Sequence, residues 1–362
     1  MVRILHAADF HLDSAFRALS PEQARQRRAE SRRTAARLVE YGNDHGTELL
    51  LLAGDLFDSS EIYGQTAEEL AQALASFHGQ VVIAPGNHDC VAAASPYVRT
   101  LWPDNVHIFT TPQITRFRFP QYGCTVYGAA FTAPEVTRGA SLAGIADGDE
   151  GVAIGLLHGE VGKSDSRYCP IDVNQIAASG LDYLALGHVH TYAGVQQAGT
   201  TAYAYPGCLE GRGFDELGDK GFLIGEVDRG SVKLHFVPFA ARRYQILPVD
   251  VTDRPPLAAV TAALPPETEG DIYRILLTGE RDEGVDADAL TAQLAGRFYA
   301  LEVRDQTTVR RDIWDGCGDD SLRGLFLQRL REQYDAASDE AQRRRIQQAA
   351  RFALAAMDNR EL

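Results

Sequence analysis

Short apolar runs alternate with amphipathic stretches along roughly the first 240 residues. Apolar runs of four to six residues that end in polar residues, glycine or proline are typical of strands buried on both faces of a sheet. The chain has such runs at 2–7, 49–53, 80–84, 125–128, 152–157 and 183–186. Amphipathic helices are predicted at about 21–43, with Gly46 just beyond, and at about 66–77, closed by Gly79. Because strand and helix alternate, we predict parallel strands in a layered α/β core.

The pattern changes in the later part of the chain. Alternating runs at 221–227 and 231–237 predict a hairpin, and strands at 244–249, 271–278 and 299–304 with a helix at 286–298 predict a small second α/β unit. Two amphipathic helices follow, the second starting at a capping signal at Ser338 and Asp339 with Gln342 and running to Met357. We therefore predict domains at 1–240 and 241–315 and a C-terminal helical hairpin at 319–362.

Composition narrows the class of protein. With 45% hydrophobic residues, the chain is expected to be a soluble globular protein of two to three domains. No apolar run approaches the roughly 18 residues of a membrane span and the first residues lack the apolar core of a signal peptide, so a cytoplasmic protein without membrane contact is expected. The five cysteines are widely spaced and form no C-x-x-C pair, which indicates buried apolar residues and not a disulfide framework. The net charge of −15 argues against a protein that holds nucleic acid by charge alone.

Acidic residues, histidines and an asparagine directly follow five of the predicted strands. The carboxyl ends of strands in an open α/β sheet meet at one edge, so these side chains are expected to lie together. Residues two apart on an extended backbone point to the same side, which predicts that Asp9 faces the same point as His11, and His188 the same point as His190. The five clusters are Asp9-Phe10-His11, Gly54-Asp55, Gly86-Asn87-His88-Asp89, His158-Gly159-Glu160 and Gly187-His188-Val189-His190.

Carboxylate, imidazole and amide oxygen together form the ligand set of borderline divalent cations such as Mn, Fe, Zn or Co. Seven candidate ligands are too many for one tetrahedral site and favour two ions that share a carboxylate. A single D-x-H or H-x-H pair would more often be a solvated loop pair, but five clusters in order after successive strands argue against that alternative. The candidates are Asp9, His11, Asp55, Asn87, His158, His188 and His190. The histidines outside these clusters, His6, His45, His78, His107 and His235, are assigned to structure or surface.

The order D-x-H, G-D, G-N-H-D, H-G and G-H-x-H within the first 190 residues resembles the calcineurin-like metallophosphoesterase superfamily. Three segments, 8–13, 53–58 and 205–210, resemble the SbcD-type nuclease subunits of DNA double-strand-break repair complexes, especially their YhaO-like branch. The resemblance covers about residues 1–240. It implies a metallophosphoesterase four-layer sandwich, with mixed β-sheets flanked by helices, a small α/β capping domain and the C-terminal helical hairpin.

The resemblance also implies roles for individual residues. One ion would be held by Asp9, His11, Asp55 and His190, and the second by Asp55, Asn87, His158 and His188, with Mn the expected metal. His88 would be the catalytic histidine, which donates to a phosphate oxygen or to the leaving group. Asp89 would orient the His88 imidazole, with a helix cap or a surface salt bridge as the alternatives. Two departures from the family pattern are Cys208, in place of a serine, and Asp58, where some archaeal relatives carry a histidine linked to exonuclease action.

The function implied is a metal-dependent DNA exonuclease or endonuclease that hydrolyses phosphodiester bonds with an activated water. The alternatives are a phosphodiesterase or phosphatase acting on a small or protein substrate, and a non-catalytic DNA-end scaffold. Arg28, Arg32 and Arg33 on the first helix would contact DNA phosphates or form a solvated face. The segment 319–362 would pack on its own core or bind an SbcC-like ABC-type coiled-coil ATPase, and relatives suggest a homodimer.

Overall fold

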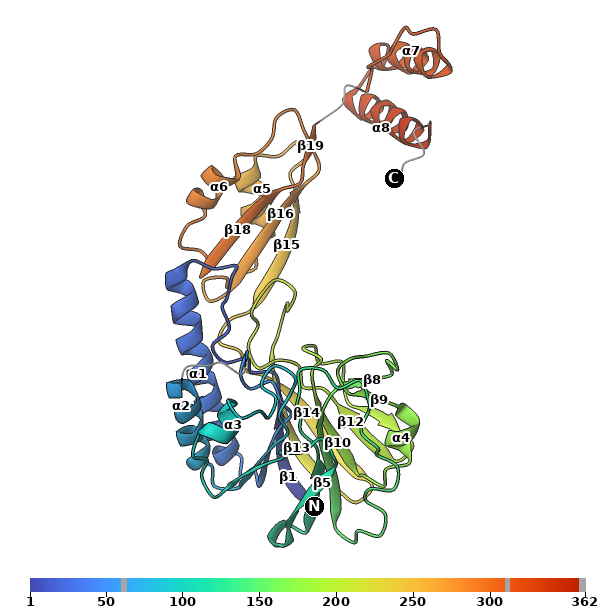
Figure 1. Cartoon of the computed structure of the whole chain (residues 1–362). Helices are drawn as coiled ribbons and strands as arrows, with labels where there is room; N and C mark the ends of the chain where they lie inside the picture. The colour runs from blue at the N-terminus through green and yellow to red at the C-terminus, as the bar shows by residue number, and fades with distance from the viewer. Residues whose placement is uncertain (60–63, 310–312, 358–362) are drawn as a thin grey trace. The chain divides into compact units, whose positions relative to one another are not determined.

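The computed structural model describes residues 1–59, 64–309 and 313–357 (Figure 1). Contacts within the chain define two compact units. The first consists of residues 1–247, 265–275 and 294–302, and the second of residues 248–264, 276–293 and 303–362. The last residues of the predicted C-terminal segment, 358–362, lie outside the described residues. The domain boundaries predicted from the sequence, after residue 240 and between residues 315 and 319, stay a prediction.

Two six-stranded mixed sheets form the centre of the first unit. The first sheet has the order β14 (Ser231–Pro238), β13 (Gly221–Asp228), β1 (Val2–Ala7), β2 (Leu49–Leu52), β3 (Gln80–Ile83) and β4 (Val106–Ile108). Strands β1 to β4 are parallel, and the predicted β13–β14 hairpin pairs antiparallel with β1. The second sheet has the order β11 (Gln196–Ala198), β12 (Thr201–Ala204), β10 (Tyr183–Gly187), β7 (Val152–His158), β6 (Cys124–Gly128) and β5 (Thr115–Phe119).

Burial on both faces of the strands explains the layers. Leu49 and Leu51 pack between the two sheets, whereas Leu50 and Leu52 pack on the outer side with residues of α1 (Pro21–Asp44) and α2 (Gly64–Ala75). A third cluster packs residues of the second sheet with α4 (Val173–Ala177). Helices therefore cover the outer faces of both sheets, as Figure 1 shows. This confirms the predicted metallophosphoesterase sandwich.

Helix α1 has the termini that its sequence predicts. Ser20 accepts a hydrogen bond from the backbone N–H of Gln23 while the Gln23 side chain accepts from the Ser20 N–H, which forms a capping box, and Pro21 occupies the first turn. The helix ends before Gly46, which has φ +60°. Helix α2 begins and ends two residues earlier than predicted, in the described part of the chain.

Several short elements of the first unit were absent from the sequence prediction. They are α3 (Pro96–Arg99), α4, the 3₁₀ turn η1 (Pro120–Tyr122), β8 (Glu160–Val161), β9 (Pro170–Ile171) and the strands β4, β5, β11 and β12. Four cysteines are buried as predicted, but Cys317 is exposed, so the expectation was wrong for that residue.

The strands of a three-stranded sheet, β15 (Tyr244–Asp250), β16 (Ile272–Thr278) and β18 (Ala300–Asp305), are divided between the two units and agree with the predicted positions. Helix α6 (Ala287–Gln293) stops short of the predicted end because the chain turns through Gly296, which has φ +85°. The second unit also contains α5 (Pro256–Ala263), which was not predicted, β17 (Glu280–Arg281) and β19 (Thr308–Val309).

The two predicted C-terminal helices are present as α7 (Leu322–Asp335) and α8 (Glu340–Met357). They contact each other, and the side chain of Asp339 caps α8 by accepting from the backbone N–H of Gln342. None of the helices in the described residues is long and apolar enough to cross a membrane.

Candidate metal centre

The loops that follow β1 and β2 run side by side at the carboxyl edge of the first sheet. The backbone N–H of Asp9 donates to the carbonyl of Gly54 at 3.0 Å, and that of His11 donates to the carbonyl of Asp55 at the same distance. These bonds extend the parallel pairing of the strands beyond their ends. The two loops therefore hold the Asp9–His11 segment and Asp55 in a fixed register.

The backbone at these positions is not extended. Four residues have positive φ values, in the region that residues other than glycine seldom adopt: Asp9 at +54°, His11 at +43°, Asp55 at +50° and His188 at +104°. The prediction that strand alternation aims Asp9 and His11 at one point was therefore wrong in its reason, because β1 ends at Ala7. Residues held at positive φ are often found at functional sites, where the surrounding structure maintains the strain.

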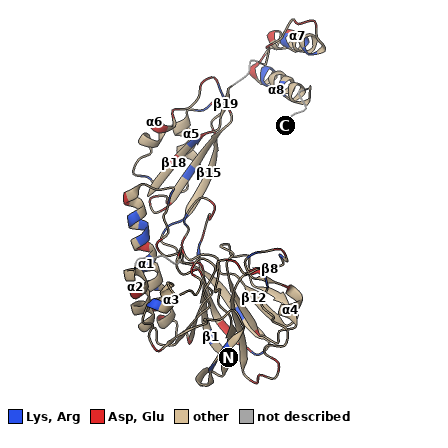
Figure 2. Cartoon of the chain, in the orientation of Figure 1, with Lys and Arg blue, Asp and Glu red and all other residues tan. Residues whose placement is uncertain are grey.

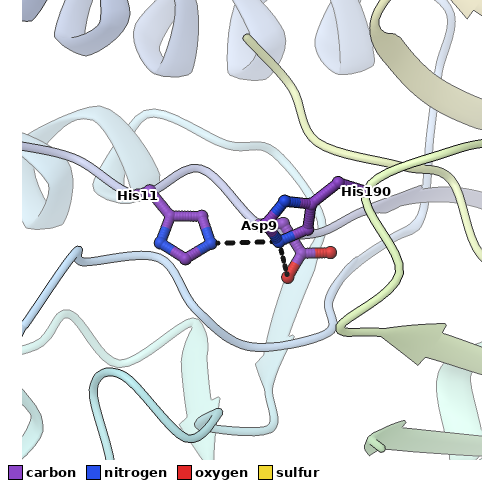
Figure 3. Close-up of side chains that lie close together, drawn as sticks. All are labelled: Asp9, His11 and His190. Atoms are coloured by element: carbon purple, nitrogen blue, oxygen red, sulfur yellow. Dashed lines mark hydrogen bonds and ion pairs between the residues drawn. The ribbon is translucent and has the colours of Figure 1, made fainter. Parts of the chain in front are cut away.

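Asp9, His11 and His190 form the first cluster (Figure 3). Nε2 of His190 lies 3.3 Å from Nε2 of His11 and 3.7 Å from Oδ1 of Asp9. Asp9 and His11 are buried, and Asp9 also accepts from the backbone N–H of His188 at 3.1 Å. Three side chains from the loops after β1 and β10 thus point their donor atoms toward one another.

Asp55 joins this cluster to a second one formed with His158 and Asn87. Oδ2 of Asp55 lies 3.4 Å from Nε2 of His158 and 3.8 Å from Nε2 of His11. Nε2 of His158 is also 3.0 Å from Oδ1 of Asn87, while its Nδ1 lies 2.9 Å from the carbonyl of Ala53. Because a carbonyl oxygen only accepts hydrogen bonds, Nδ1 of His158 carries a hydrogen, and Nε2 is directed toward the acidic side chains. Asp55 is therefore placed to be shared between two groups.

His188 is the candidate ligand that belongs to neither of these two clusters. Its ring lies edge-on to that of His158, with 5.3 Å between centroids, and 4.9 Å from the ring of Tyr168. No group of three histidine, cysteine or acidic donor atoms within 4.8 Å of one another includes it among the residues that the structure describes. The backbone N–H of His188 nevertheless donates to Asp9. This hydrogen bond links the loop after β10 to the loop after β1 of the first sheet.

The donor set fits divalent cations. Nδ1 of His190 faces the carboxylate of Glu216 at 2.7 Å, and Nδ1 of His11 forms an ion-pair contact with Asp58 at 3.2 Å. The carboxylate of Glu216 is an acceptor, so a neutral His190 carries its hydrogen on Nδ1 and directs a lone pair from Nε2 toward His11. The contact of His11 with Asp58 has an ion-pair distance but no hydrogen-bond geometry. A cation between the two Nε2 atoms could be bound by both rings. Donors bound to one ion at about 2.1 Å lie roughly 3.0 to 3.4 Å apart, close to the distances found here.

Electrostatics in the cluster favour positive charge. Burial acts to lower the pKa of His158, but the facing Asp55 carboxylate outweighs it and raises this pKa to about 9. Burial raises the pKa of Asp9 to about 6, and burial lowers that of His11 to about 4. Burial also opposes ionisation of Asp55, yet the imidazole of His158 holds its pKa below the ordinary value. The two buried carboxylates therefore attract a proton or a metal ion to the space between the rings.

The calcineurin-like phosphoesterase model matches residues 2–192, which is more than half of the chain and includes every residue of the two clusters. The chain belongs to this family. Members of the metallophosphoesterase family bind divalent metals, and the clusters provide groups that can hold them.

The chain is similar to three curated proteins, two of which have names that refer to DNA repair or to a nuclease. It is 31% identical over 267 residues to the uncharacterized metallophosphoesterase YhaO of Bacillus subtilis (strain 168), which covers 71% of this chain and 65% of YhaO. It is 27% identical to the DNA double-strand break repair protein Mre11 of Aeropyrum pernix and to the SbcD component of the nuclease SbcCD of Rhodobacter capsulatus. Those matches cover 61% and 55% of this chain, and 56% and 50% of the relatives. The chain thus spans less than two thirds of the length of the relatives it matches.

Three residues that the sequence analysis did not place in the site surround the first cluster. Arg212 donates from Nη2 to Glu216 at 2.7 Å and from Nη1 to Asp58 at 3.1 Å. Glu216 and Asp58 in turn contact His190 and His11. The sequence contained only an indirect signal for this layer, namely the carboxylate of Asp58 in the G-D-L-F-D segment.

His88 lies at the exposed side of the cluster. Its Nδ1 is 2.9 Å from the backbone carbonyl of Asp58, and its ring lies edge-on to that of His11 with 4.8 Å between centroids. The backbone N–H of His88 donates to Oδ1 of Asp55 at 2.9 Å. Because a carbonyl oxygen only accepts hydrogen bonds, Nδ1 of His88 carries a hydrogen. Nε2 is then the ring nitrogen that this carbonyl does not engage, and the ring is accessible.

Asp89 does not contact the His88 imidazole, so the prediction that it orients this ring is corrected. Instead its carboxylate is fully buried and accepts from the backbone N–H groups of Leu56, Phe57 and Gly86 and from the hydroxyl of Tyr97. Asp89 joins the two loops that carry Asp55 and Asn87. Gly86 permits this close packing, because a Cβ there would lie 2.2 Å from Oδ1 of Asp55.

The arginines of α1 form a smaller basic face than the sequence indicated, although Figure 2 shows basic residues along this helix. Arg27 is fully buried between Glu30 and Glu210. Arg32 is half-buried and paired with Asp13 at 2.8 Å and with Glu69 at 3.1 Å. Among the three candidate DNA contacts, Arg33 is exposed and Arg28 is half-buried.

Proposed function

We propose that this chain is a metal-dependent DNA nuclease that hydrolyses phosphodiester bonds as an exonuclease or endonuclease. The observation that carries the proposal is the convergence of carboxylates, imidazoles and one amide at the edges of both sheets. Asp55 lies within 3.8 Å of imidazoles from two clusters, as a carboxylate shared by two ions would. The similarity to the repair protein Mre11 and to the SbcD component of the nuclease SbcCD supports DNA as the substrate.

In this proposal the two clusters hold two divalent ions, with Mn as the expected metal. Asp9, His11, Asp55 and His190 would ligate one ion, and Asp55, Asn87, His158 and His188 the other. When bound, such ions would lower the pKa of a water for in-line attack on a phosphodiester and would supply positive charge to the attacking and leaving oxygens. The carbonyl of Ala53 and the carboxylate of Glu216 hold the rings of His158 and His190 with Nε2 directed inward.

His88 is the proposed catalytic histidine. The carbonyl of Asp58 holds Nδ1, so Nε2 can carry the proton that is donated to a phosphate oxygen or to the leaving 3′ or 5′ oxygen. His88 is exposed, whereas His11 and His158 are buried, which suits a group that meets a large substrate.

The test is hydrolysis of 5′- and 3′-labelled single- and double-stranded DNA with Mn, Mg or a chelator. We expect His88→Ala to keep metal binding and to lose at least about 100-fold in turnover, as removal of a general acid does. His78→Ala changes an exposed histidine of the same unit and is the matched control. Full activity of His88→Ala on DNA would refute the assignment.

A small-substrate phosphodiesterase is distinguished by the same experiment. Turnover of bis-p-nitrophenyl phosphate without cleavage of any labelled DNA would favour a small or protein substrate. DNA binding without hydrolysis of either substrate, in the presence of Mn, would favour a scaffold.

DNA contact by α1 is proposed for Arg28 and Arg33, since Arg32 is engaged by Asp13 and Glu69. Arg28→Glu with Arg33→Glu should weaken DNA binding at low salt, because each phosphate contact releases condensed counterions. Unchanged affinity at low salt would exclude this face.

The helices α7 and α8 are the proposed docking site for an SbcC-like ABC-type coiled-coil ATPase. Leu322, Leu325 and Phe352 are exposed by 81%, 56% and 50%, although they are large apolar side chains. Arg344 and Arg345 of the predicted basic run are exposed as well. Removing residues 319–362 should abolish co-purification with the ATPase, and retained co-purification would contradict the proposal.

A further inference from the structure

Arg212 lies outside the proposed ligands but contacts two carboxylates that touch them. Its Nε and Nη2 donate to Glu216, its backbone N–H donates to Oε2 of Glu216 at 2.8 Å, and its Nη1 donates to Oδ1 of Asp58. The Arg212 side chain is 20% exposed and that of Glu216 is 5% exposed. The nitrogens of the guanidinium thus donate to two protein carboxylates.

Each of the two carboxylates acts on a different imidazole. Glu216 lies 2.7 Å from Nδ1 of His190, and Asp58 lies 3.2 Å from Nδ1 of His11. These are the two rings whose Nε2 atoms face each other at 3.3 Å. Nη2 of Arg212 also lies 3.2 Å from Nδ1 of His190. One guanidinium is therefore connected to two proposed ligands of the same ion position, to His190 directly and through Glu216, and to His11 through Asp58.

The backbone of His190 is fixed independently of Arg212. Its carbonyl accepts from Nζ of Lys220 at 3.0 Å and from the backbone N–H of Cys208 at 3.4 Å. Rotation of the His190 side chain is then the remaining freedom, and the contacts of its Nδ1 with Glu216 and with Nη2 of Arg212 limit it. The role left to Arg212 is to keep Glu216 and the ring in place.

Two other roles for this cluster fit less well. A direct contact between Arg212 and a phosphate would need donors that are already bound to Glu216 and Asp58. His11, Asp58 and His88 also form a group with donor atoms close enough for a cation. However, the guanidinium 3.1 Å from Asp58 would repel a metal ion there.

We propose that Arg212 is a positioning residue that aims Nε2 of His190 and His11 at one of the two ion positions, through Glu216 and Asp58 and through its own contact with Nδ1 of His190, and so sets the metal affinity of that position alone. This inference rests on the proposed two-ion site. The second position, with His158 held by the carbonyl of Ala53, receives no contact from Arg212 within the described residues.

The test is a calorimetric titration of the metal-free full-length protein with Mn, combined with the metal content after dialysis. For Arg212→Met we expect one of two Mn sites to weaken by roughly 10- to 100-fold, as for other residues that orient metal-ligating histidines. The other site should keep its affinity. Arg212→Lys should weaken the same site less, because an ammonium keeps the charge but not the fork.

Four further variants complete the test, and the first two assign the affected site. His190→Ala should remove the site that Arg212→Met weakens, and His158→Ala should remove the other. Arg118→Met, at an exposed arginine of β5, is the matched control and should leave both sites unchanged. Glu216→Gln, which keeps the shape of the side chain, should reproduce the selective loss if Arg212→Met does not fold.

Each outcome has a defined meaning. Two unchanged sites in Arg212→Met and Glu216→Gln, or equal weakening of both sites, would overturn the role of Arg212 while the wild type still binds two ions. A wild type that binds no Mn would instead refute the proposed two-ion site.

Discussion

Replacing Asp89 by alanine tests how the two ligand-bearing loops are held together. The Asp89 carboxylate is fully buried and accepts four hydrogen bonds, two from the loop that carries Asp55, one from the loop that carries Asn87 and one from Tyr97 of α3. The distances are 2.7 Å to the N–H of Leu56, 3.2 Å to that of Phe57, 2.8 Å to that of Gly86 and 2.6 Å to the Tyr97 hydroxyl. Alanine would leave all four donors without their acceptor.

The expected loss of stability follows from these contacts. A hydrogen bond to an ionised group contributes about 1.5 to 3 kcal/mol, and leaving a buried donor unpaired costs about 1 to 3 kcal/mol. Relief of the burial of the carboxylate offsets part of this loss, because burial raises the pKa of Asp89 to about 6. We expect Asp89→Ala to lower the free energy of unfolding by about 3 to 5 kcal/mol, which corresponds to a fall in Tm of roughly 6 to 20 °C.

The assay is urea and thermal unfolding followed by circular dichroism at about pH 8, where the carboxylate is ionised. Tyr97→Phe removes one donor and keeps the ring, so it should cost only about 1 kcal/mol and serves as the graded control. A loss below about 1 kcal/mol for Asp89→Ala, or a loss no larger than that of Tyr97→Phe, would refute the role of Asp89 as the link between the loops.

Three further predictions concern pH, a buried ion pair and metal. Burial lowers the pKa of His6 to about 3, below its value in the unfolded chain, so the free energy of unfolding should fall as the pH drops from about 6.5 toward 3. His6→Gln should make the urea midpoint less dependent on pH in this range. An unchanged slope would contradict this. Arg27→Met should cost about 3 to 5 kcal/mol in urea unfolding, because Glu210 loses its buried partner; a cost near zero would contradict the pairing. Mn at about 100 times the Kd of each site should raise the stability of the wild type in thermal unfolding by about 2.7 kcal/mol for each site that is filled, and a chelator should reverse this. An unchanged Tm would argue against ion binding to the folded state.

The placement of the candidate ligands at the carboxyl ends of strands could be predicted from the sequence because it depends on strand order. The expectation of a single sheet edge was wrong, because Asp9, Asp55 and Asn87 follow strands of one sheet whereas His158 ends a strand of the other sheet and His188 follows one. Apolar runs locate the strands, and a sheet of parallel strands brings their carboxyl ends together whatever the loops do. The detailed direction of Asp9 and His11 could not be predicted in the same way. Their positive φ values arise from hydrogen bonds to the loop of Asp55, which lies more than 40 residues away.

The contacts that surround the candidate ligands could not be predicted from the sequence for a related reason. Asp58 and Arg212 are 154 residues apart and meet only because separate loops return to the same edge. The burial of Arg27 was also hidden, since its neighbours on the helix suggest a basic face. Only Glu30, three residues later, signalled an ion pair, whereas the second partner, Glu210, lies 183 residues away.

The acidic net charge can be reconciled with a nucleic-acid substrate through the site itself. Four carboxylates, those of Asp9, Asp55, Asp58 and Glu216, surround the clusters, and Arg212 is the cation that pairs with the last two. This excess of negative charge would repel a phosphodiester, and two divalent ions would reverse it. The negative charge that argues against DNA binding by the bare chain is therefore, at this site, what a pair of metal ions requires. On the proposed function, the affinity for DNA depends on the ions more than on the protein surface.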